Sequence, residues 1–127
     1  MKKLVLVLIL IGSLSFTACK KDAQINDFLK EYASVIDAVS EKLDDGDADA
    51  AQKIFDDRKD NLRWKWEKIK YTRSWQVNKD TLNKMNSYPQ EHIDALVKTS
   101  NEAIKKKPED EEKIKNLVNA IANTVRR

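Results

Sequence analysis

The residues best suited to bind another molecule are concentrated in one short segment, residues 63–75. This segment contains all three tryptophans of the chain, one tyrosine and five basic residues. If the segment is helical, a rotation of about 100° per residue places two apolar faces on it. One face holds Leu62, Trp66 and Ile69, and the other centres on Trp64 and Tyr71. The pattern predicts either a helix packed on both sides or a helix that binds a partner with its second face.

The second face is the candidate binding face, and it consists of Trp64, Lys68, Tyr71 and Trp75. Exposed aromatic and basic side chains of this kind often dominate the binding energy of protein interfaces. They also suit an anionic membrane surface or single-stranded nucleic acid. If the helix is packed on both sides, the third or fourth helix covers the second face, and we expect this for Tyr71 and Trp75. We expect Trp64 to be partly exposed and Trp66 to be buried in either case.

The sequence offers little for catalysis or metal binding. His92, the only histidine, is flanked by carboxylates, but no nucleophile is spaced to work with it, so we expect an exposed helical histidine. A single Cys and a single His exclude a Cys/His zinc site. The acidic run 109–112 lacks EF-hand spacing and suits the start of a helix. We therefore expect a protein that is not an enzyme and uses no metal or cofactor.

The first eighteen residues have the pattern of a secretory signal peptide. Lys2 and Lys3 precede an unbroken apolar run, residues 4–11, and small residues separate this run from Cys19. The eight-residue run is shorter than the ~20 residues that a spanning helix needs. We expect residues 1–18 to be removed during export.

The end of this leader resembles the lipobox of bacterial lipoproteins. Thr17, Ala18 and Cys19 directly follow the apolar run, although Phe16 stands where the family most often has Leu. The resemblance covers residues 1–19 only. It implies that the Cys19 thiol carries a diacylglyceryl group and that the new N-terminal amine is often acylated too. A plain secretory signal, cut after Ala18 to leave a free thiol, is the alternative.

The residues after Cys19 bear on localisation within the envelope. Lys20 is not the Asp that retains lipoproteins at the inner membrane in enterobacterial-type sorting, so an outer membrane is favoured. The stretch 20–22 also resembles the short charged tag of lipoproteins that some bacteria send to their surface. The lipoprotein would therefore lie on the periplasmic side or on the cell surface.

Together these patterns predict a lipid-anchored domain, residues 19–127, that works by binding. Its membrane contact would be the lipid on Cys19, and its partner a protein or another component of the envelope. Export argues against nucleic acid. Two alternatives stay open, namely a small inhibitor or protective protein against an envelope-active enzyme, and a binder of a small apolar ligand.

The composition indicates an all-α domain. The chain has 127 residues, 35% of them charged, with 2 Gly and 2 Pro, which argues against a β-sandwich or barrel. Residues 20–57 hold 5 basic and 11 acidic side chains, whereas residues 58–107 hold 13 basic and 6 acidic ones. The formal net charge is only +3. This distribution indicates attraction between neighbouring helices within the domain.

Four amphipathic segments follow the leader. The first spans about 22–45, where apolar residues recur every three or four positions, and Gly46 suits its left-handed C-cap. Asp47 suits the N-cap of the second segment. No Gly or Pro then occurs before Pro89, so the second helix either runs for up to about forty residues or breaks near Asn78.

The third segment is expected to begin at residues 87–90, where Pro89 suits a first helical turn. Pro108 separates it from the fourth, whose apolar positions run from Ile114 to Val125. These segments predict an antiparallel bundle of about four helices with a long second helix.

Overall fold

The computed structural model describes residues 16–127, and this part of the chain is almost entirely helical. No strand occurs in it, so the predicted all-α fold is confirmed. The elements are the helices α2 (Phe16–Asp44), α3 (Ala48–Ile69), α4 (Lys79–Lys106) and α5 (Glu111–Asn123), with short 3₁₀ turns η1 (Ser74–Gln76) and η2 (Pro108–Asp110).

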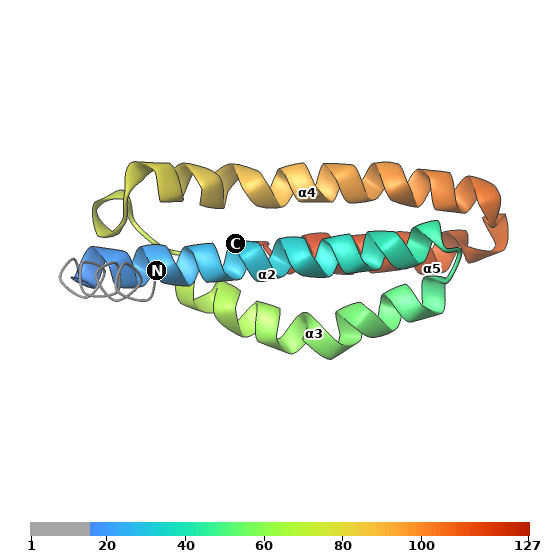
Figure 1. Cartoon of the computed structure of the whole chain (residues 1–127), viewed down its shortest axis with the longest axis horizontal. Helices are drawn as coiled ribbons and strands as arrows, with labels where there is room; N and C mark the ends of the chain where they lie inside the picture. Colours follow the sequence, from blue (N-terminus) through green and yellow to red (C-terminus); the bar gives the residue numbers. More distant parts are fainter. Residues whose placement is uncertain (1–15) are drawn as a thin grey trace, which may run out of the picture.

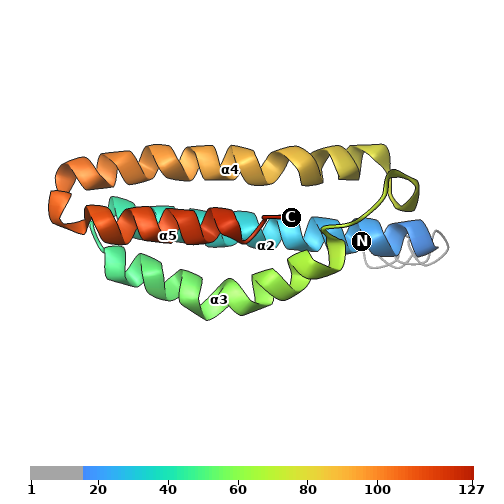
Figure 2. The same ribbon diagram turned by 180° about the vertical axis from the view of Figure 1, so that it is seen from behind.

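Consecutive helices run in opposite directions and form the predicted antiparallel bundle of four helices (Figure 1). α3 and α4 lie on opposite sides of a layer formed by α2 and α5, as both views show (Figures 1 and 2). The connection from α3 to α4, residues 70–78, therefore crosses one end of the bundle. α5 is the shortest helix, and the chain ends about half-way along the bundle (Figure 2).

The core is built on the apolar stripe of α2, which supplies more buried side chains than any other helix. Phe28 stacks on Tyr32 and packs against Trp66 of α3, with ring centroids 5.5 and 5.3 Å apart. The Tyr32 hydroxyl donates a hydrogen bond of 2.7 Å to the Ile121 carbonyl of α5. Buried side chains extend from Ile25 to Thr124. Residues 20–127 therefore contain every buried side chain that the structure describes.

The turn between α2 and α3 forms as predicted. Gly46 has a φ of +76°, the left-handed conformation that favours glycine. Its N–H bonds to the Leu43 carbonyl and the Asp47 N–H bonds to the Lys42 carbonyl, which is the Schellman pattern. The Asp47 carboxylate then accepts from the Ala50 N–H at 2.9 Å and caps α3.

The second helix is shorter than the continuous alternative. α3 has 22 residues and ends at Ile69, so the break expected near Asn78 is present but begins earlier, at residue 70. α2 and α4, with 29 and 28 residues, are longer than α3, so the second helix is not the longest of the bundle. The Thr72 hydroxyl donates to the Ile69 carbonyl at 2.6 Å and satisfies a group at the end of α3.

The predicted start of the third helix at residues 87–90 is wrong. α4 begins at Lys79, where the Asn78 side chain accepts from the Asp80 N–H at 3.0 Å, and Pro89 lies inside the helix. Proline removes one helical hydrogen bond there. The helix tolerates this because Met85, Pro89 and other residues on the same face are buried against the core.

Candidate binding face

The three tryptophans differ sharply in their exposure to solvent. Trp66 is 3% exposed, as predicted, while Trp64 is 58% and Trp75 is 79% exposed. Tyr71 is 73% exposed. Partial exposure of Trp64 is therefore confirmed, but the expectation that helices cover Tyr71 and Trp75 is wrong. Both residues follow the end of α3 at Ile69, so they lie in the connection across the end of the bundle and not on a helix face.

Hydrogen bonds within the 70–78 connection give it a defined shape. The Arg73 N–H donates to the Gln76 side-chain oxygen at 2.8 Å, and the Gln76 N–H donates to the Arg73 carbonyl at 3.0 Å. These paired bonds form η1, the turn that carries Trp75. Val77, two residues later, is 9% exposed and packs into the core. The buried Val77 holds the connection in place while Trp75 projects into solvent.

The start of α2 lies against the same connection. The Lys21 ammonium donates to the Lys68 carbonyl at 3.1 Å, and the Asp22 carboxylate accepts from the Asn78 N–H at 3.0 Å. These contacts join residues that are 47 and 56 positions apart. The structure thus brings the predicted binding face next to the beginning of the domain, which the sequence analysis did not anticipate.

Ammonium groups accompany the exposed aromatic rings. The Lys68 nitrogen lies 3.5 Å from the centroid of the Trp64 ring, within the range of a cation–π interaction. The Lys70 nitrogen lies 5.0 Å from the centroid of the Tyr71 ring. Lys70 also pairs with Glu67 at 2.8 Å, and the hydrogen bond between them raises the pKa of Lys70. Trp64, Lys68 and Tyr71 therefore present aromatic and positively charged groups together.

A cluster of charged and polar side chains connects α2 to α3. The Glu31 carboxylate accepts from Arg58 at 3.1 Å and from Asn61 at 2.7 Å, and it pairs with Lys65 at 2.6 Å. Lys65 also pairs with Asp27 at 2.7 Å. These ion pairs confirm the predicted attraction between oppositely charged helices, and they give this cluster a structural role.

The electrostatics of Glu31 follow from two opposing causes. Its side chain is only 10% exposed, and burial by itself would raise its pKa. The hydrogen bonds from Lys65, Asn61 and Arg58 outweigh burial and lower the pKa of Glu31. The pKa of Lys65 is raised, first by its hydrogen bond to Asp27 and then by its hydrogen bond to Glu31.

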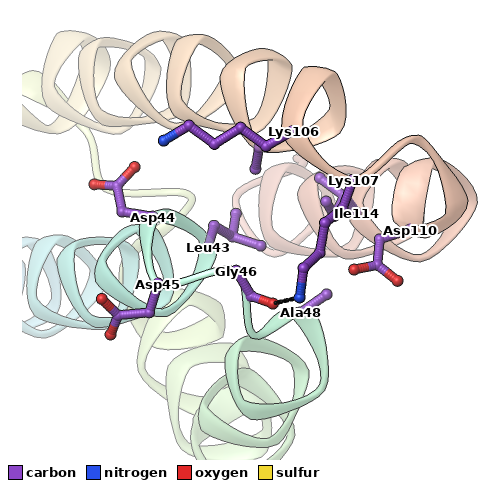
Figure 3. Close-up of a pocket in the computed structure, with 10 residues that line it drawn as sticks. Leu43, Asp44, Asp45, Gly46, Ala48, Lys106, Lys107, Asp110 and Ile114 are labelled. Atoms are coloured by element: carbon purple, nitrogen blue, oxygen red, sulfur yellow. Dashed lines mark hydrogen bonds between the residues drawn. The ribbon is translucent and has the colours of Figure 1, made fainter.

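Two pockets border the core. One, of about 240 Å³, lies beneath the two turns and is lined by Leu43, Ala48 and Ile114, with Lys107 bonded to the Gly46 carbonyl at its rim (Figure 3). The other, of about 230 Å³, lies beside Trp66. Sites for drug-sized ligands usually measure about 300–1,000 Å³. Both pockets are smaller than this. A third pocket, of about 460 Å³, is lined mainly by the charged side chains Asp45, Asp47, Asp49, Lys107 and Asp110, so none of the three favours the alternative of a small apolar ligand.

His92 lies on α4 and is partly buried, not exposed as predicted. His92 packs edge-on against the Tyr88 ring, with centroids 6.2 Å apart. Between residues 16 and 127 no cluster of His, Cys, Asp or Glu side chains is arranged to hold a metal ion. Residues 1–15 of the predicted signal peptide, and the side chain of Cys19, the predicted lipidation site, lie outside the part that the structure describes.

Comparison with known proteins gives no relative to argue from. No family model, curated protein or solved structure matches this chain. None of the described helices is long and apolar enough to cross a membrane.

Proposed function

We propose that this chain is a lipid-anchored protein of the bacterial cell envelope that acts by binding and not by catalysis. The lipid is carried by Cys19 after removal of residues 1–18, and an outer membrane is its favoured location. The binding face consists of Trp64, Lys68, Tyr71 and Trp75.

The exposure of the aromatic side chains carries this proposal. The three most exposed large apolar side chains of the described residues, Trp64, Tyr71 and Trp75, all fall within twelve consecutive residues. Burying a large apolar side chain stabilises a protein by about 1.5–3 kcal/mol. The domain does not gain this stabilisation in full at the three exposed positions. Clustered exposed apolar surface in soluble proteins marks interaction sites.

Binding, as opposed to catalysis, is supported by the chemistry of this face. Indole, phenol and ammonium groups stack and form ionic contacts. A nucleophile or general base would need a second group held within hydrogen-bond distance. The ion pair of Lys70 with Glu67 fixes the charge of Lys70 and does not prepare it for proton transfer.

Photocrosslinking in intact cells tests the binding face. A photoreactive amino acid replaces Trp75 in the full-length protein, and the matched control replaces Glu102, an exposed residue near the other end of the bundle. We expect a discrete adduct at position 75 that is missing at position 102. The same adducts at both positions, or no adduct to protein or lipid at position 75, would contradict a binding face here. A captured hydrolase would favour the inhibitor alternative.

Metabolic labelling tests the anchor. Cells that express the full-length protein should incorporate labelled fatty acid into it, and the protein should partition into the detergent phase. Cys19→Ala should leave an uncleaved precursor without label. Wild-type protein in the aqueous phase would show that the lipoprotein assignment is wrong.

A further inference from the structure

We propose that the partner of this face is an anionic lipid bilayer, so that the bundle stands on the membrane with residues 70–78 toward the lipid headgroups. The inference rests on the proposed function, because it names the partner of the same face.

The position of the face relative to the chain start is the first argument. Lys21 and Asp22 contact Lys68 and Asn78 directly, so α2 begins at the end of the bundle that carries the connection (Figure 1). A helix rises about 1.5 Å per residue, which places the backbone of Cys19 about 3 Å along the axis from that of Lys21. A lipid on Cys19 would therefore bring this end, and not the opposite one, to the membrane.

The charges of the two ends are the second argument. At the end with the connection, residues 20–22 and 67–80 hold six basic and three acidic side chains. At the opposite end, residues 41–50 and 102–112 hold four basic and ten acidic side chains. An anionic surface attracts the first end and repels the second, so it orients the bundle in the same sense as a lipid on Cys19.

The composition of the face favours lipid over protein as the partner. Tryptophan and tyrosine prefer the headgroup level of a bilayer, where their amphipathic rings contact both apolar and polar groups. Six basic residues lie in the same two segments, 20–22 and 67–80, and five of the six are lysines, which protein interfaces avoid. The six are Lys20, Lys21, Lys68, Lys70, Arg73 and Lys79. Lys20, Arg73 and Lys79 form no ion pair within residues 16–127 and are free for lipid phosphates.

A tethered form of the domain tests this orientation. Residues 19–127 contain every buried side chain that the structure describes, and Cys19 is the only cysteine, so its thiol can be coupled to a maleimide-bearing lipid in preformed vesicles. The vesicles contain phosphatidylcholine with or without phosphatidylglycerol, together with lipids brominated near the headgroup. Quenching of tryptophan fluorescence by bromine reports contact between an indole ring and the bilayer.

We expect strong quenching with phosphatidylglycerol at low salt, and weak quenching without it or at high salt. Trp75→Phe should remove roughly half of the quenching, because two of the three tryptophans are exposed. The matched control adds Glu102→Trp to Trp75→Phe and should restore none of it. Circular dichroism of each variant checks that the fold is unchanged.

Three results would overturn the inference. They are equal quenching at positions 75 and 102, equal quenching in neutral and anionic vesicles, and no loss of quenching in Trp75→Phe. If quenching is absent while position 75 crosslinks to a protein in cells, the membrane inference fails and the proposed function stands. If quenching and crosslinking are both absent, both fail.

Discussion

The three tryptophans allow a direct test of the structure, because one substitution type probes three different environments. Trp66→Ala, Trp64→Ala and Trp75→Ala are made singly in the segment 20–127, which contains every buried side chain that the structure describes. If the exposures are correct, the three changes should lower the free energy of unfolding by clearly different amounts.

The loss at Trp66 should be the largest. Its ring packs against Phe28 with centroids 5.3 Å apart, and its indole N–H donates to the Arg126 carbonyl at 3.2 Å. Replacing a buried tryptophan by alanine costs about 3–5 kcal/mol. With a urea dependence of about 2 kcal/mol per M, a loss of about 4 kcal/mol lowers the unfolding midpoint by about 2 M.

The losses at the exposed positions follow from the area that each ring buries. Trp75 is 79% exposed, so about one fifth of a surface of about 200 Å² is buried, or about 1 kcal/mol at about 25 cal/mol per Å². Trp64 is 58% exposed, which gives about 2 kcal/mol by the same estimate. Both values are upper bounds, since the unfolded chain is partly compact. At position 64 alanine also has a higher helix propensity than tryptophan, which reduces the expected loss of stability.

Urea unfolding followed by circular dichroism at the helix band measures all three without relying on tryptophan fluorescence. We expect the order Trp66, Trp64, Trp75, with Trp75→Ala close to wild type. A loss of 3 kcal/mol or more at Trp75 would refute the exposed position of this residue and restore the helix packed on both faces.

Three further changes test other parts of the bundle. Gly46→Ala should cost about 1–2 kcal/mol, because φ is +76° and the new Cβ lies 3.3 Å from the Lys107 side chain; thermal unfolding should show it, and an unchanged melting temperature would contradict this turn geometry. Ile36→Ala or Ile121→Ala should each cost about 2–5 kcal/mol in urea unfolding, since both side chains are almost fully buried, and a cost below 1 kcal/mol at both would argue against the shared core. Glu31 has a lowered pKa in the folded state, so its ionisation stabilises the fold above the unfolded pKa of about 4.5, and this contribution is lost as the pH falls through the folded pKa. Melting temperatures measured downward from pH 7 should therefore fall less steeply on the acid side in Glu31→Gln than in wild type, with Glu67→Gln, an exposed carboxylate, as the control.

Much of the fold follows from local sequence patterns. The apolar stripe from Ile25 to Leu43 specifies one buried helix face whatever packs against it, because the spacing matches the helical period. Gly46 and Asp47 specify the turn after α2, because their conformations and hydrogen bonds involve only neighbouring residues. The burial of Trp66 belongs to the same class, since it shares a face with Leu62 and Ile69.

The candidate site depended on information that is not local. The rule that proline starts or breaks a helix placed the third helix at residues 87–90, whereas burial of Met85 and Pro89 on one face extends α4 back to Lys79. Because α3 ends at Ile69, Trp75 lies in an exposed turn and not, as predicted, on a packed helix face.

The sequence by itself determined the residue types of the binding face and the helical stripes that bury the core. Only the tertiary structure decided that Tyr71 and Trp75 face solvent and that they lie beside the start of α2. The physical reason is that α3 and α4 pack on opposite sides of α2, so their connection must cross the end of the bundle (Figure 1). That crossing depends on which helices are neighbours, and the helical period of one segment contains no information about its neighbours.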